Sequence, residues 1–165
     1  MEDIALVPAL VAGAVALACA VAGGVLTRLG PWYDQLRKPS FQPPDWLFGP
    51  AWTVIFTLTA IAGYRAWMGA APADATWILA LFLVNALLNA AWSGFFFTMR
   101  RPDWALCEVA LLWLSIIILI VAIWPIDFTA AALLIPYLLW VSFAAVLNLA
   151  VVRLNAPFGA KTASE

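Results

Sequence analysis

The sequence predicts an all-α membrane protein, a bundle of five transmembrane helices with a proline-rich lid loop between the first and second helices. Two observations on composition lead to this prediction. Of the 165 residues, 66% are hydrophobic and only 10% are charged, and the mean hydropathy is +1.00. A soluble domain averages about 45–50% apolar and about 25% charged residues. This composition excludes a soluble enzyme, a disordered chain and a disulfide scaffold.

The third observation is a series of five apolar segments, each long enough to cross a bilayer, which takes about 20 helical residues. The segments cover residues 4–26, 46–68, 75–99, 103–126 and 128–152. The first follows Glu2 and Asp3, whereas a cleaved signal peptide begins with a positive region, so we expect it to be retained as a span. The segments predict one transmembrane domain, residues 1–155, followed by a polar tail, residues 156–165.

Lysine and arginine are distributed unevenly between the two sides of such a bundle. The side with the first loop, the third loop and the C-terminus carries seven of them: Arg28, Arg37, Lys38, Arg100, Arg101, Arg153 and Lys161. The other side carries only Arg65. Cytoplasmic loops are enriched in Lys and Arg, which predicts an outside N-terminus and a cytoplasmic first loop and C-terminus. The net charge of −1 leaves no basic face for nucleic acid.

The first loop, residues 27–45, contains four prolines, which exclude a regular helix across it. Its Trp32, Tyr33 and Phe41 are too apolar for a free linker. We therefore expect the loop to fold back over the helix ends as a lid.

Aromatic and amide side chains fall at matching depths of several predicted helices. Four of the ten tryptophans are too deep for an interfacial belt: Trp52, Trp92, Trp113 and Trp140. On the third helix Asn85, Asn89 and Trp92 share one face, and on the fifth helix Tyr137, Trp140 and Ala144 do the same. Buried amides must face the bundle interior. From spacing alone, interhelical hydrogen bonding and a pocket for a flat, polarisable ligand are equally supported.

Other residues carry weaker signals. Small residues recur every fourth position at Ala12, Ala16, Ala20 and Gly24 and at Ala86, Ala90 and Gly94, which favours close packing within the monomer over a dimer contact. Cys19 and Cys107 lie in apolar segments and read as packing residues. Glu108 reads as an interfacial carboxylate near Arg100 or Arg101 rather than a proton relay. Histidine is absent, so we expect no metal site and no histidine-ligated cofactor.

Four stretches together resemble the TspO/MBR family, the tryptophan-rich sensory proteins and the mitochondrial translocator protein or peripheral benzodiazepine receptor. They are Trp32–Pro39, Gln42–Trp52, Asn89–Phe97 and Pro136–Ala144. The number and order of the five spans agree with that family, so the resemblance covers nearly the whole chain.

The resemblance implies a five-helix bundle, commonly a homodimer, that binds porphyrins such as protoporphyrin IX and benzodiazepine-type ligands, with porphyrin as ligand rather than cofactor. Residue by residue, the family pocket falls on Trp32, Tyr33, Trp52 and Trp140, and its amide falls on Asn85 or Asn89, of which the depth along the helix favours Asn85. Our spacing analysis adds Trp92, Tyr137 and Ala144 as candidate ligand-binding residues. The family's sterol-recognition stretch needs an aromatic residue where this chain has Leu149, so we assign no sterol binding.

Two functions follow as expectations. The first is a membrane receptor or binding protein for tetrapyrroles, with a regulatory or transport role. The alternative is a light-dependent porphyrin-degrading enzyme, in which the resemblance places the photochemistry on Trp32 and Trp140. The sequence favours the receptor, because no pair of acid and base side chains lies at depth for hydrolytic chemistry.

Overall fold

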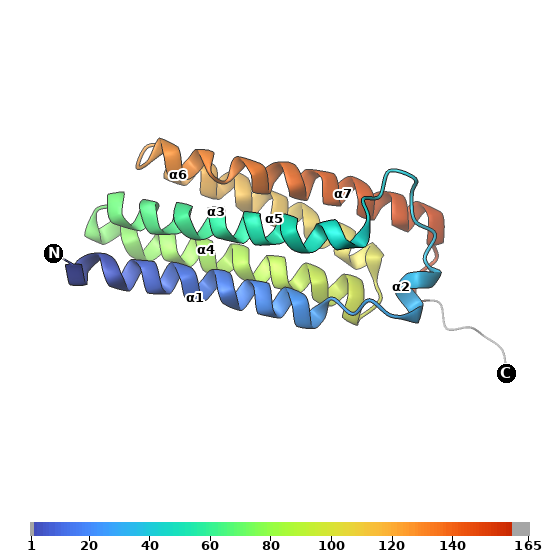
Figure 1. The fold of residues 1–165 in the computed structure, drawn as a ribbon. Helices are drawn as coiled ribbons and strands as arrows, with labels where there is room; N and C mark the ends of the chain where they lie inside the picture. The colour runs from blue at the N-terminus through green and yellow to red at the C-terminus, as the bar shows by residue number, and fades with distance from the viewer. Residues whose placement is uncertain (1, 160–165) are drawn as a thin grey trace.

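Five long helical segments run side by side along one axis, as the sequence predicts (Figure 1). The computed structural model describes residues 2–159. The long helices are α1 (Glu2–Leu26), α3 (Phe48–Gly69), α4 (Pro72–Ser93), α5 (Pro102–Ile123) and α7 (Ile135–Asn155). Short elements join or extend them: α2 (Pro31–Gln35), η1 (Asp45–Leu47), the π-helical turn η2 (Gly94–Thr98) and α6 (Phe128–Ala132). Five of these segments are long and apolar enough to span a membrane.

Prolines explain where the observed helix ends differ from the predicted ones. α4 begins at Pro72, three residues before the predicted start, because proline suits the first turn of a helix, where its missing N–H has no partner to lose. α5 ends at Ile123, three residues before the predicted end, because Pro125 cannot donate to the helical ladder.

The fifth predicted span, residues 128–152, is broken into α6 and α7 just before Pro136. α6 ends at Ala132 and α7 begins at Ile135, with Pro136 in its first turn. A proline ring clashes with the carbonyl group four residues before it, and for Pro136 that residue is Ala132. The clash falls where α6 ends, so the interruption precedes the proline.

The bundle is held together mainly by apolar side chains around α5. Val109, Leu112, Ile116, Leu119 and Ile123 are all buried, and they belong to two apolar clusters, one toward each end of the bundle. α1 packs on α3 and α4. There the Cys19 thiol lies 3.7 Å from the carbonyl oxygen of Ala86, so part of the small-residue ridge on α4 faces α1 within the monomer.

The first loop and the end of α7 lie at the same end of the bundle (Figure 1). The Arg37 backbone N–H donates to Asn155 Oδ1 at 2.8 Å, and Asn155 Nδ2 donates to the Arg37 carbonyl at 2.9 Å. Residues 160–165, with Lys161 and most of the predicted polar tail, lie outside the described residues.

At the opposite end, Arg65 pairs with Asp127 at 2.8 Å. The Ala130 N–H bonds the Asp127 carboxylate and, together with Arg65, keeps the pKa of Asp127 below its usual value. This cap and ion pair fix the turn between α5 and α6 against the end of α3.

Candidate functional site

A cavity of about 370 Å³ lies in the half of the bundle nearest the first loop. We call it the main cavity. Its walls come from α1, α3, α4 and α7, and the first loop contributes Tyr33 and Asp45. Seven aromatic side chains line it: Tyr33, Phe48, Trp52, Phe56, Trp92, Phe97 and Trp140. Its volume lies within the range of small-molecule sites, roughly 300–1,000 Å³.

The aromatic rings on α3 and α7 support one another. Trp52 stacks on Phe56 with centroids 5.2 Å apart, and it meets Trp140 edge-to-face at 6.5 Å. Phe48 meets Trp140 edge-to-face at 5.7 Å. These distances fall in the favourable range for aromatic pairs. The indoles are thus held in place before any ligand binds.

The opposite wall is shaped by the π-helical turn η2. Here Met99 N–H donates to the Gly94 carbonyl, five residues back, at 2.8 Å. The extra residue rotates the end of this helix, so that Trp92 and Phe97 line the main cavity while Phe96 stacks on Trp92 at 5.2 Å. Such π turns interrupt α-helices frequently at functional sites.

One hydrogen-bond donor in this wall is unused. Trp92 Nε1 is buried and has no hydrogen-bond partner among the described residues. Buried polar groups are nearly always bonded, because leaving one unbonded costs free energy. Trp92 thus carries an unpaired N–H in a side chain that lines the main cavity. Asn89, one turn earlier, donates to Tyr137 Oη at 3.1 Å.

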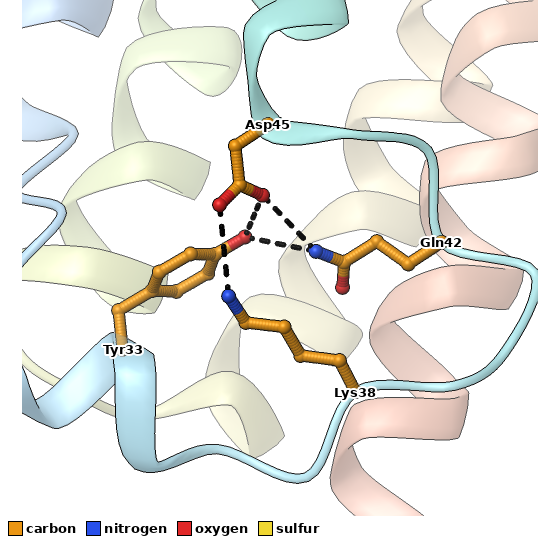
Figure 2. Close-up of polar contacts among 4 residues, drawn as sticks. All are labelled: Tyr33, Lys38, Gln42 and Asp45. Atoms are coloured by element: carbon orange, nitrogen blue, oxygen red, sulfur yellow. Dashed lines mark hydrogen bonds and ion pairs between the residues drawn. The ribbon is translucent and has the colours of Figure 1, made fainter.

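Four polar side chains of the first loop contact one another beside the main cavity (Figure 2), and two of them, Tyr33 and Asp45, line it. Tyr33 Oη donates to Asp45 Oδ1 at 3.0 Å, and Gln42 Nε2 donates to the same oxygen at 3.1 Å. Lys38 Nζ lies 3.6 Å from Asp45 Oδ2 and 3.8 Å from the centre of the Tyr33 ring. Burial, and then the hydrogen bond to Asp45, raise the pKa of Tyr33 to about 12, so its hydroxyl is a donor at neutral pH.

Six of the nine predicted ligand-binding residues line the main cavity: Tyr33, Trp52, Asn89, Trp92, Trp140 and Ala144. The other three do not. Trp32 lies outside, in a hollow at the end of the bundle with Arg100 and Arg101, and meets Phe96 edge-to-face at 6.3 Å. Asn85 and Tyr137 lie deeper.

Asn85 and Tyr137 line a second, smaller cavity of about 50 Å³, which we call the inner cavity. It lies farther from the first loop, between α1, α3 and α4. Asn85 Nδ2 donates to Ser115 Oγ at 2.9 Å, so this amide joins α4 to α5. Asn89 lines both cavities. The structure thus places one of the two candidate amides at the main cavity and the other below it.

Sequence reasoning missed the contribution of α1. Ala20, Gly23 and Gly24 of this helix line the main cavity, and so does Thr27, the first residue after it. A Cβ added at Gly23 or Gly24 would meet no atom within 4 Å, because open space lies beside both. The ridge of small residues on this helix was the available signal, but close packing and a cavity wall need the same residue types.

Two other expectations are corrected. Trp113 has the predicted depth, but it is 37% exposed on the outside of the bundle and donates to Ser142 Oγ at 2.8 Å. Glu108 pairs with neither Arg100 nor Arg101: it is 6% exposed, and neither carboxylate oxygen has a hydrogen-bond partner among the described residues. Arg101, one of its expected neighbours, pairs instead with Asp103.

Among residues 2–159, no group of three or more Cys, Asp or Glu side chains is placed to hold a metal ion. The main cavity instead combines aromatic rings with a few polar groups, and its charged lining residue, Asp45, is paired with Lys38.

Five apolar helices, four of which line an aromatic cavity, define a class of protein, a multi-pass integral membrane protein with a cavity in its helical bundle. The TspO/MBR family model matches residues 10–154, and the chain belongs to this family. It is 38% identical over 143 residues to Protein CrtK of Rhodobacter capsulatus. The matched region covers 86% of this chain and 89% of that protein. It is 39% identical over 143 residues to the tryptophan-rich protein TspO of Chlorobaculum tepidum, with 84% and 90% covered. With the translocator protein of Homo sapiens it shares 36% identity over 126 residues, or 75% of each chain.

Proposed function

We propose that this protein is a membrane receptor or binding protein for porphyrins of the protoporphyrin IX type and for benzodiazepine-type ligands, with a regulatory or transport role. One observation carries the proposal: three indoles from three different helices, Trp52, Trp92 and Trp140, line a single cavity within the bundle.

The chemistry of the main cavity suits a flat aromatic ligand. Its volume of about 370 Å³ is large enough for such a molecule. Rings on opposite walls offer π faces and edges to a planar partner. Trp92 Nε1 and Asn89 supply directional hydrogen bonds. The chain has no histidine, so the proposed binding of porphyrin relies on its ring faces and edges and does not require an iron ligand.

The proposed role includes a lid. The first loop contributes Tyr33 and Asp45 to the main cavity, and its Phe41 rests edge-to-face on Phe143 of α7 at 6.4 Å. Opening of this loop would admit a ligand from the side where Arg28, Arg37, Lys38, Arg100 and Arg101 gather. The excess of basic residues supports a cytoplasmic position for this side.

Relatives' names are consistent with either downstream role. One relative from Cereibacter sphaeroides is called a tryptophan-rich sensory protein, and the human relative is called a translocator protein. Sensing and translocation both begin with reversible ligand binding. The family resemblance further suggests that the functional unit is a homodimer.

The proposal is tested by titrating the purified protein with protoporphyrin IX and following tryptophan fluorescence. Ala144 lines the main cavity, so Ala144→Phe fills part of it and should weaken binding at least tenfold. Val146 is 58% exposed on the outside of the same helix, so Val146→Phe is the matched control and should bind as the wild type does. Absent saturable binding to the wild type, or equal affinity of both variants, would contradict the proposal.

A second function, light-dependent degradation of porphyrin, is favoured by the position of Trp52 and Trp140 in the cavity wall. Indoles beside a bound chromophore can donate an electron to its excited state. Trp32, the other expected participant, lies outside the cavity. Illuminating the complex with and without the Trp140→Phe substitution separates the two functions. Fluorescence quenching without loss of porphyrin supports the receptor, whereas light-dependent loss that requires Trp140 and gives one product supports the enzyme.

A further inference from the structure

We propose that the inner cavity is a subsite for a short, uncharged side group of the ligand, one that carries a hydroxyl. The inference rests on the proposed function, because the ring system carrying that group would occupy the main cavity.

The main cavity and the inner cavity are neighbours in the bundle. Both are lined by Phe56 and Asn89, so these two side chains form their common wall. The inner cavity continues along α4 from Asn89 to Ile78, a distance of roughly 16 Å at 1.5 Å per residue. The cavities therefore follow one another along the bundle axis, and a substituent passing Asn89 would enter the inner cavity.

The second step is size. The inner cavity has a volume of about 50 Å³. A single water molecule needs at least roughly 10–15 Å³ by this kind of measure. The inner cavity thus has room for a group of a few non-hydrogen atoms and excludes an aromatic ring system.

The third step is an unused hydroxyl. Threonine in a helix normally bonds the carbonyl four residues back. On α3, Thr53 does so to Gly49 at 3.0 Å and Thr57 does so to Thr53 at 2.8 Å. Thr59 lines the inner cavity, and its Oγ1 is buried with no hydrogen-bond partner among the described residues. A rotation about its Cα–Cβ bond would turn this unpaired hydroxyl toward a group that enters the cavity.

A second residue with a hydroxyl lines the same cavity. Tyr137 lines the inner cavity and accepts a hydrogen bond from Asn89, so its own proton can still be donated. Asn85 Nδ2 is already used by Ser115. All other lining residues are apolar apart from Cys19, and none of the lining residues is charged. A carboxylate would be poorly solvated here, whereas a short alkyl group that carries a hydroxyl matches both the apolar walls and the two hydroxyls.

Two porphyrins that differ only in the presence of such groups provide the probes. Deuteroporphyrin IX carries hydrogen at the two positions where haematoporphyrin IX carries 1-hydroxyethyl groups, each of three non-hydrogen atoms. The measurement is the ratio of their affinities for the full-length protein. Thr59→Val keeps the shape of the side chain and removes its hydroxyl. It should lower the ratio of haematoporphyrin to deuteroporphyrin affinity about three- to tenfold, the effect of one hydrogen bond.

Thr57→Val is the matched control, because Thr57 lies two residues earlier, outside both cavities, with its hydroxyl bonded to the backbone. It should leave the ratio unchanged. Ala60→Leu, which fills the inner cavity from the same helix, should remove the preference for the substituted porphyrin. A ratio that Thr59→Val and Ala60→Leu both leave unchanged would overturn the inference while leaving the proposed function intact. Failure of both porphyrins to bind the wild type would overturn the proposed function and the subsite with it.

Discussion

Asp45 is the centre of the contacts that hold the first loop over the main cavity (Figure 2). Its carboxylate accepts hydrogen bonds from Tyr33 and Gln42 and pairs with Lys38. We expect Asp45→Ala to release the middle of the loop while leaving the bundle folded, because no apolar core residue is removed.

The magnitude follows from the contacts. A hydrogen bond to a charged group contributes about 1.5–3 kcal/mol. The Asp45 side chain is 43% exposed, so solvent screening reduces the contribution of each of its hydrogen bonds. The exposed ion pair with Lys38 adds at most about 1 kcal/mol. Tyr33 and Gln42 also retain their mutual hydrogen bond of 3.2 Å. We therefore estimate a loss of about 2 kcal/mol, or roughly a thirtyfold increase in the open fraction of the loop.

Hydrogen exchange of the loop amides measures this change. The Gln42 N–H, which bonds the Pro39 carbonyl at 3.0 Å, should exchange at least tenfold faster in Asp45→Ala. The Arg37 N–H should change less, because Asn155 holds it independently at 2.8 Å. Asp34→Ala removes an exposed carboxylate from α2 and is the control. Equal exchange of Gln42 in the wild type and both variants would refute the role assigned to Asp45.

Two further predictions concern the loop and the bundle. The pKa of Tyr33 is raised, so the stability that its neutral hydroxyl contributes is complete below the unfolded value near pH 10 and is lost as the pH rises to about 12. In an alkaline titration, the difference in ultraviolet absorbance between the wild type and Tyr33→Phe should show a phenolate midpoint near 12. A midpoint at 10 would contradict the burial and hydrogen bonding of this hydroxyl. Asn148 is 1% exposed, and its amide, oriented to satisfy both partners, donates to the Pro102 carbonyl at 3.1 Å and accepts from the Leu106 N–H at 3.0 Å. Asn148→Ala should therefore lower the free energy of unfolding by about 1–3 kcal/mol, measured by thermal denaturation in detergent. Val146→Ala, at a residue exposed on the outside of the same helix, should change it little, and equal stability of the two variants would contradict the bridging role of Asn148.

The five spans were predictable because a bilayer imposes a minimum helix length on any apolar segment. Sequence reasoning also placed Asn89 and Trp92 on one face, since helical periodicity fixes which residues share a face. The same reasoning gave Trp113 the correct depth but not its direction, because depth along a helix does not determine which side of that helix meets the other helices. Trp113 therefore lies outside the bundle.

The first loop was the least predictable part. Its conformation depends on contacts between residues distant in the sequence, such as Arg37 with Asn155, 118 residues apart. Those contacts place Tyr33 at the cavity and Trp32, the adjacent residue, outside it. The π-helical turn at Gly94 was also missed, because one extra residue in a helical turn leaves no signal in an apolar pattern.

The structure of the lipid-embedded protein with protoporphyrin IX bound would test most directly whether the indoles form a binding site. The account predicts that the macrocycle lies under the first loop, against Trp52, Trp92 and Trp140. A macrocycle on the outer, lipid-facing surface, with the main cavity unchanged, would contradict it.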